Sequence, residues 1–203
     1  MSEDAEEDES AGDGEVPEDV DADDLEELLE ADPAAGAQGA GGMPGTHVRA
    51  MEFWDDIIAD MEATAAEYEE AGWETLQLHP GDVTTLTPDD ESDMFGLDVL
   101  VPNNEFDAVE AHLEDDVSFD AYEAYRATGE GLVLLVVAME DHDAEVAVFY
   151  PAYYDPSNAQ PMLTAAERAG EMRTYIRTLT NERIEFTHDE PENFGPPTGS
   201  DAE

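Results

Sequence analysis

The chain has 203 residues, of which 55 are acidic and six are basic, so its formal net charge is −49. All six basic residues are arginine, and both lysine and cysteine are absent. The lack of cysteine excludes a disulfide framework and thiolate chemistry, and it disfavours cysteine-based zinc sites. The negative charge disfavours binding to nucleic acid and to anionic membrane surfaces, because both need positive charge on the protein.

The acidity extends along the whole chain. Residues 1–45 contain 17 acidic and no basic residues, which leaves 38 acidic and six basic residues, or a charge of −32, on the remaining 158. This distribution favours adaptation to high salt over a local acidic motif. Screening shortens from about 10 Å in 0.1 M salt to about 3 Å in 1 M salt. We therefore expect the chain to be most compact above about 1 M salt.

Residues 1–45 are dominated by Asp, Glu, Ala and Gly, a composition that predicts a disordered acidic tail. Within the tail, Leu25, Leu28 and Leu29 lie at helical spacing, which fits either a recognition helix for a partner or a transient helix. The N-terminus lacks the features of a signal peptide, and the longest apolar run, residues 131–139, is too short to span a membrane. We expect a cytoplasmic protein.

Residues 46–194 have the length and pattern of one ordered domain, followed by a disordered C-terminal tail at 195–203. A first helix is predicted from Thr46, as its N-cap, to a C-cap at Gly72. Strands are predicted at 73–78 and 96–101, with a turn at Pro80-Gly81 between them. Asn103 or Asn104 caps a second helix, whose apolar positions are Phe106, Val109 and Leu113.

The second half of the domain begins with the strongest strand pattern in the chain. Strands at 122–128 and 132–139 are joined by the turn Gly129-Glu130-Gly131, and a third strand at 146–150 follows the turn at 141–143. A third helix is predicted over 161–179 and a last strand over 183–187. The sequence therefore predicts an α+β fold: a single domain with three helices and one mostly antiparallel sheet of about five to six strands.

Histidine and carboxylate residues form one candidate site. His188, Asp189 and Glu190 follow one another at the end of the last strand, where they could bind a divalent metal or perform acid/base chemistry. A further ligand would come from His142 or His79. A histidine beside carboxylates is also expected by chance in so acidic a chain, and no familiar metal motif is present, so we predict no cofactor and retain a divalent metal as the alternative.

Arginine and tyrosine form a second candidate site. Arg168, Arg173 and Arg177 lie close together in the predicted third helix, where they could clamp an anionic ligand or form structural ion pairs with neighbouring acids. Tyr153 and Tyr154, after the strand at 146–150, could line a ligand pocket or close the core.

Three segments of the predicted domain are distinctive: Gly-Leu-Val-Leu-Leu-Val-Val at 131–137, Val-Ala-Val-Phe-Tyr-Pro-Ala-Tyr-Tyr at 146–154 and Phe-Thr-His-Asp-Glu-Pro-Glu-Asn-Phe at 186–194. Together they resemble an uncharacterised family of small acidic haloarchaeal proteins. The resemblance covers Phe53 to Phe194 and implies a salt-rich archaeal cytoplasm, but no activity. We therefore predict a non-enzymatic binding or regulatory module for a protein partner or small ligand. The alternative is a metal-dependent or acid/base enzyme that uses His188, Asp189 and Glu190.

Overall fold

The computed structural model describes residues 44–89 and 92–197, with side chains omitted for 44–49 and 52. The predicted acidic tail and its leucine pattern lie outside the described residues. The chain divides into two units, Met1–Gly39 and Ala40–Glu203, and the fold below is that of the second. No helix in the described part is both long and apolar enough to cross a membrane.

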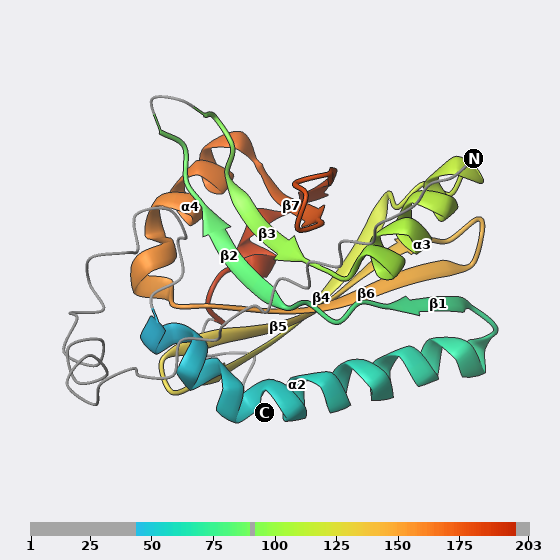
Figure 1. Ribbon diagram of the computed structural model, residues 1–203, viewed down its shortest axis with the longest axis horizontal. Helices are drawn as coiled ribbons and strands as arrows, with labels where there is room; N and C mark the ends of the chain where they lie inside the picture. Colours follow the sequence, from blue (N-terminus) through green and yellow to red (C-terminus); the bar gives the residue numbers. More distant parts are fainter. Residues whose placement is uncertain (1–43, 90–91, 198–203) are drawn as a thin grey trace, which may run out of the picture. The chain divides into compact units, whose positions relative to one another are not determined.

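Three α-helices, eight strands and one short 3₁₀ helix make up the described residues (Figure 1). In chain order they are α2 (Pro44–Ala71), β1 (Glu74–Gln77), β2 (Asp82–Leu86), β3 (Gly96–Leu100), α3 (Asn103–Glu114), β4 (Ala121–Gly129), β5 (Leu132–Asp141), β6 (Val146–Tyr154), α4 (Pro156–Ala169), β7 (Glu171–Arg177), β8 (Arg183–Asp189) and η2 (Pro191–Phe194).

The strands form two four-stranded sheets. The first, sheet A, has the order β1-β6-β5-β4, in which β1 and β6 are parallel and the other pairs antiparallel. The second, sheet B, has the order β2-β3-β7-β8, in which only β3 and β7 are parallel. Strand β4 is therefore one edge of sheet A, and β8 is one edge of sheet B.

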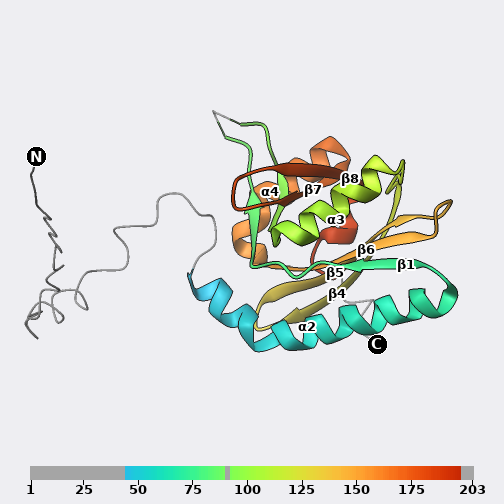
Figure 2. The same cartoon turned by 45° about the vertical axis from the view of Figure 1, so that its right-hand side comes forward.

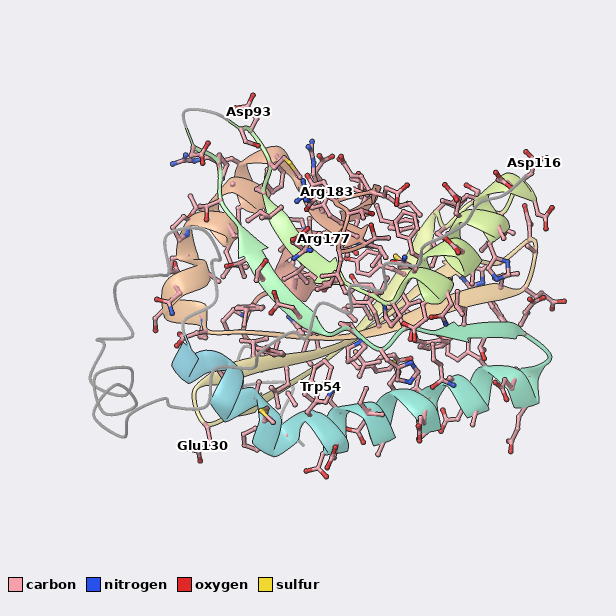
Figure 3. The ribbon with its side chains drawn as sticks, viewed as in Figure 1. Trp54, Asp93, Asp116, Glu130, Arg177 and Arg183 are labelled. Carbon is pink, nitrogen blue, oxygen red and sulfur yellow. The ribbon has the colours of Figure 1, made fainter. Side chains whose placement is uncertain are left out.

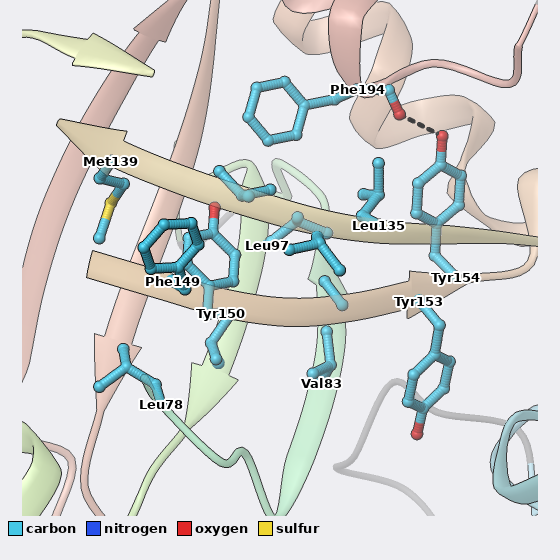
Figure 4. Packing of buried hydrophobic residues seen from close by; sticks show 14 of the residues in the cluster. Leu78, Val83, Leu97, Leu135, Met139, Phe149, Tyr150, Tyr153, Tyr154 and Phe194 are labelled. Atoms are coloured by element: carbon cyan, nitrogen blue, oxygen red, sulfur yellow. Dashed lines mark hydrogen bonds between the residues drawn. The ribbon is translucent and has the colours of Figure 1, made fainter. Parts of the chain in front are cut away.

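Sheet A lies between α2 and sheet B (Figures 1 and 2). Because both of its faces are covered, every residue of β5 and β6 is buried. The core between the sheets contains large side chains from β6, β5 and β3, among them Tyr150, Met139 and Leu97 (Figure 4). Burial of this much apolar surface is the main force that holds the two sheets together.

Local sequence signals set several boundaries. Gly72, with φ of 100°, ends α2 in a Schellman motif, in which Trp73 N–H donates to Tyr68 O and Gly72 N–H to Glu69 O. The β4–β5 hairpin turns at Glu130 and Gly131, both with positive φ, as a two-residue type I′ turn requires. Both the Gly72 cap and this hairpin confirm the predictions from sequence.

The α+β class is confirmed, but the predicted single sheet of about five to six strands is wrong. The eight strands form two mixed sheets, and β2 was missed. Strand β6 also continues through Pro151 to Tyr154, beyond the predicted end at Tyr150. Proline is tolerated there because β1 pairs only with residues 146–149, so the β1 side of β6 needs no donor at Pro151.

The predicted helix at 161–179 is also wrong in its second half. Helix α4 begins after the N-cap Asp155 and ends at Gly170, whose φ is 76°, and β7 follows directly. Met172 and Ile176 are four residues apart, a spacing that fits one face of a strand as well as one face of a helix. Leu179, the last residue of the predicted helix, is 79 % exposed. The predicted caps at Thr46 and Asn103 or Asn104 are displaced as well, since α2 begins at Pro44 and Pro102 precedes α3.

Candidate functional site

A groove of about 340 Å³ runs between α2 and the edge of sheet A. Helix α2 packs on β1, β6 and β5 but has no comparable contact with β4, so the outer part of this face stays open. Ile57, Leu134 and Val136 supply apolar surface to the groove. Its size and apolar lining are those of a small-molecule or side-chain binding site.

The charged groups that border the groove are carboxylates. Asp56, Asp60 and Glu67 lie on the face of α2 that lines it. Within the described part of the chain, none of the three forms an ion pair. Arg126 also belongs to the lining, but its guanidinium donates to the carbonyls of Glu192 (2.8 Å) and Gly195 (3.4 Å). The groove thus combines apolar surface with three carboxylates that no ion pair among the described residues neutralises.

Two aromatic residues border the same groove. Phe53 lies close to Gly129 in the β4–β5 hairpin, and a methyl group added at Gly129 would contact its ring at 2.9 Å. Tyr125 is 41 % exposed, and its hydroxyl donates to Glu123 Oε2 at 2.5 Å. Burial, followed by this hydrogen bond, raises the pKa of Tyr125 to about 12, so the hydroxyl remains protonated at neutral pH. The groove is therefore also bordered by aromatic rings, a kind of group that attracts organic cations.

The arginine candidates lie on the outer face of sheet B. Arg173 and Arg177 belong to β7, not to a helix, and period-two alternation still places them on one face. Arg183 is the cross-strand partner of Arg177, and Figure 3 shows the two side chains near each other. Arg168, by contrast, is an exposed residue in the last turn of α4, and no contact joins it to the others among the described residues.

This arginine group is neutralised by carboxylates. Arg177 Nε is 2.5 Å from Asp98 Oδ2, and Arg183 Nε is 3.6 Å from Asp98 Oδ1. Arg173 pairs with Glu171 at 2.6 Å and approaches Glu185 at 3.5 Å. Three arginines therefore face three carboxylates, and the arrangement supports the structural ion pairs considered from sequence rather than an open anion clamp.

Tyr153 and Tyr154 point to opposite sides of β6 (Figure 4). Tyr154 is buried, and its hydroxyl donates to the Phe194 carbonyl at 2.5 Å, so it ties η2 to the core. Tyr153 packs edge-on against Trp54, with ring centroids 5.7 Å apart, and lines a smaller hollow of about 170 Å³. The two side chains therefore do not meet in one pocket.

His188 is a buried residue between the sheets. Its side chain is 4 % exposed, and Nε2 lies 3.1 Å from Thr174 Oγ1, which in turn lies 2.7 Å from the Tyr150 hydroxyl. The rings of Tyr122 and Phe194 pack against the imidazole at 4.9 and 5.1 Å. Burial lowers the pKa of His188 to about 4, so the ring is neutral near pH 7.

Asp189 lines the same hollow of about 260 Å³ as His188, but the other members of the histidine hypothesis lie elsewhere. Asp189 and Glu190 are exposed, and strand alternation turns the Asp189 side chain away from the face that holds His188. His142 pairs instead with Glu140 at 2.9 Å and packs on Trp73. His79 contacts Glu105 at 3.1 Å. Across residues 44–89 and 92–197, no three His, Asp or Glu side chains are grouped so that they could hold a metal ion.

The groove was not predicted from the sequence, because the candidate sites centred on the less common histidine, arginine and tyrosine residues. The available signal was on α2, where Asp56, Asp60 and Glu67 follow the helical repeat beside Ile57. That pattern is also typical of the ordinary boundary between the buried and solvated faces of a helix, so it does not indicate a groove by itself. The groove forms because β4 lies beyond the part of sheet A that α2 covers, and this placement is not visible in the sequence.

The chain belongs to a protein family described as a family of unknown function, DUF7529, whose model matches residues 42–196. The matched range contains every helix and strand of the described residues. Neither a curated protein nor a solved structure matches the chain.

Proposed function

We propose that this protein is a non-enzymatic binding module whose α2–β4 groove holds a partner or ligand that combines apolar surface with positive charge. The observation that carries the proposal is the absence, among the described residues, of any ion-pair partner for the three carboxylates beside the apolar surface. On sheet B, by contrast, Arg173, Arg177 and Arg183 lie against acids such as Asp98 and Glu171. A positively charged group of a partner would pair with the three carboxylates of the groove.

High salt determines which interactions can contribute to binding in the groove. In molar salt, screening over about 3 Å removes long-range attraction, so general acidity does not select a partner. Contact pairs and apolar burial still operate at that range, and burial contributes about 25 cal/mol per Å² of apolar area. A groove that offers carboxylates for contact pairs beside apolar surface can therefore select a cation with an apolar body over the simple cations of a concentrated salt solution.

The alternative function is a metal-dependent or acid/base enzyme that uses His188, Asp189 and Glu190. Its geometric support is weaker. The imidazole of His188 is directed into the interior and is occupied by Thr174, while the two carboxylates are exposed. An acid/base group with a pKa of about 4 is also largely deprotonated at neutral pH and is a weak base.

We further propose that the module works in a salt-rich cytoplasm, as in haloarchaea, and that it binds neither nucleic acid nor membranes. A net charge of −49 and the absence of lysine support this setting. Carboxylates stay hydrated in concentrated salt, whereas the long apolar stem of lysine adds surface that salt makes harder to keep in solution. Phosphate-rich partners would meet repulsion over most of the chain.

Benzyltrimethylammonium, which joins an apolar ring to a fixed positive charge, is the probe for the proposed function. We expect saturable binding in 2 M KCl, followed by NMR shifts of backbone amides, with the largest shifts at the groove residues of α2, β4 and β5. Benzyl alcohol, which lacks the charge, should bind at least about tenfold more weakly, a difference of about 1.4 kcal/mol. Equal binding of the two probes would contradict a role for the carboxylates.

Two matched pairs of variants locate the site. Ala63 and Ala66 are both exposed on α2, but only Ala63 lines the groove. Ala63→Arg should weaken probe binding at least about tenfold, whereas Ala66→Arg should leave it within about twofold. Asp60→Asn should weaken binding and Asp55→Asn, outside the groove, should not. If both members of each pair behave alike, the probe binds elsewhere and the proposal fails.

A further inference from the structure

The outer edge of β4 runs alongside the groove. Strand β4 ends the order of sheet A, and no other strand in the described ranges pairs with its outer side. It is nine residues long, and Glu123, Ala127 and Thr128 are exposed along it. An edge of this length presents unpaired backbone groups that can accept an added strand.

The hairpin geometry shows which backbone groups face outward. Gly129 and Leu132 flank the two-residue turn and form a hydrogen-bonded pair, and such pairs alternate along an antiparallel ladder. Ala127, Tyr125 and Glu123 therefore direct their N–H and C=O groups toward β5. Thr128 and Ala124, at alternate positions, direct theirs away from β5, toward a potential partner strand.

The side chains of β4 also divide by face. Tyr125 and Ala127 lie on the α2 side and line the groove, whereas Tyr122 lies on the other side, against His188. A strand added to β4 would place every second side chain on the α2 side. Because Ala127 is small, a long side chain at that level can extend across β4 toward the carboxylates that line the groove.

Resting on the proposed function, we propose that the natural occupant is an extended segment of a protein partner that adds a fifth strand to sheet A along β4. On its α2-facing side the segment carries arginine or lysine, whose stems cover the apolar surface and whose charges meet the carboxylates of the groove. Backbone pairing supplies affinity, and the groove supplies the preference for cationic side chains.

Charge complementarity favours this occupant over a second copy of the chain. Two copies joined through β4 would bring Glu123 and the carboxylates of both grooves together, and like charges on adjacent strands are destabilising. A basic extended segment removes this repulsion and leaves the carboxylates paired.

The test uses a blocked heptapeptide in which arginine and valine alternate between two terminal threonines, titrated into the full chain in 2 M KCl. We expect binding that Ala63→Arg weakens and Ala66→Arg does not. Replacing the three arginines by glutamate should abolish it. Sedimentation of the protein without peptide should give the mass of a monomer; a concentration-dependent dimer that loses its stability on Ala124→Pro would overturn the proposal in favour of a second copy.

Two N-methylated forms of the peptide test the backbone pairing. In a strand, successive N–H groups point to opposite edges, so only one alternate set can donate to β4. An antiparallel segment with its arginines toward α2 donates from the valines, and a parallel one donates from the arginines. Methylation of one set should therefore weaken binding at least about tenfold, and methylation of the other should have much less effect.

The outcomes separate the two proposals. If both methylated peptides bind as tightly as the parent while benzyltrimethylammonium still binds in the groove, strand addition is wrong and the proposed function stands. If neither the peptide nor the small cation responds to Ala63→Arg, both proposals fail.

Discussion

Thr174 joins two buried hydrogen-bonding groups across the sheets. Its Oγ1 lies 2.7 Å from the Tyr150 hydroxyl on sheet A and 3.1 Å from His188 Nε2 on β8, and all three side chains are buried. Valine has nearly the shape of threonine but no hydroxyl. Thr174→Val thus leaves two buried polar groups without a partner, each at a cost of about 1–3 kcal/mol. We expect the free energy of unfolding to fall by about 2–6 kcal/mol.

The same network predicts a reversal of sign. In the native protein, Tyr150→Phe removes one hydrogen bond and should cost about 1 kcal/mol. In the Thr174→Val background the tyrosine hydroxyl is already unsatisfied, so Tyr150→Phe removes a buried orphan group and should stabilise the protein by about 1 kcal/mol.

Urea unfolding at constant 2 M KCl, followed by circular dichroism, measures all four members of this cycle. The m-values should agree among them, so that midpoints report stability alone. If Tyr150→Phe destabilises the Thr174→Val protein as much as it destabilises the native one, the two hydroxyls are not coupled and the reasoning is refuted.

Three further predictions concern pH, backbone packing and salt. His188 has a pKa of about 4 in the folded protein and about 6.5 when unfolded, so the unfolded state takes up the proton first as the pH falls. The contribution of His188 to the free energy of unfolding is therefore complete above pH 6.5 and falls by up to about 3 kcal/mol as the pH drops toward 4. In urea unfolding at a series of pH values, His188→Gln should remove this loss. Gly96 has a φ of 129°, and an added Cβ would lie 2.0 Å from the Arg173 carbonyl oxygen, so Gly96→Ala should lower the thermal midpoint sharply, while Gly81→Ala, with open space around it, should not. Circular dichroism across a KCl titration should show the native signal gained up to about 1 M salt, and a fully folded, thermally stable protein in dilute buffer would contradict the expected salt dependence.

The sequence predicted those elements whose signals are local. The Schellman end at Gly72 and the turn at Glu130-Gly131 depend on single residues with positive φ, and β5 is marked by an unbroken apolar run. The boundary between α4 and β7 was lost because Met172 and Ile176 satisfy both helical and strand periodicity. Pairing is non-local, so neither the division into two sheets nor the parallel pairs could be read from the order of elements.

The groove was harder to predict because, in so acidic a chain, the rare arginines are the more distinctive candidates for a binding site. In the structure, the carboxylates beside α2 are the better candidates. Arg173, Arg177 and Arg183 are rare, yet each lies against a carboxylate, and their positive charge is compensated within sheet B. Asp60 and Glu67 are two of many acids, yet they lie beside apolar surface and have no ion-pair partner among the described residues. Recognition depends on charge that remains uncompensated next to surface that gains from burial, and in this protein the two conditions coincide at the α2–β4 groove rather than at the arginines.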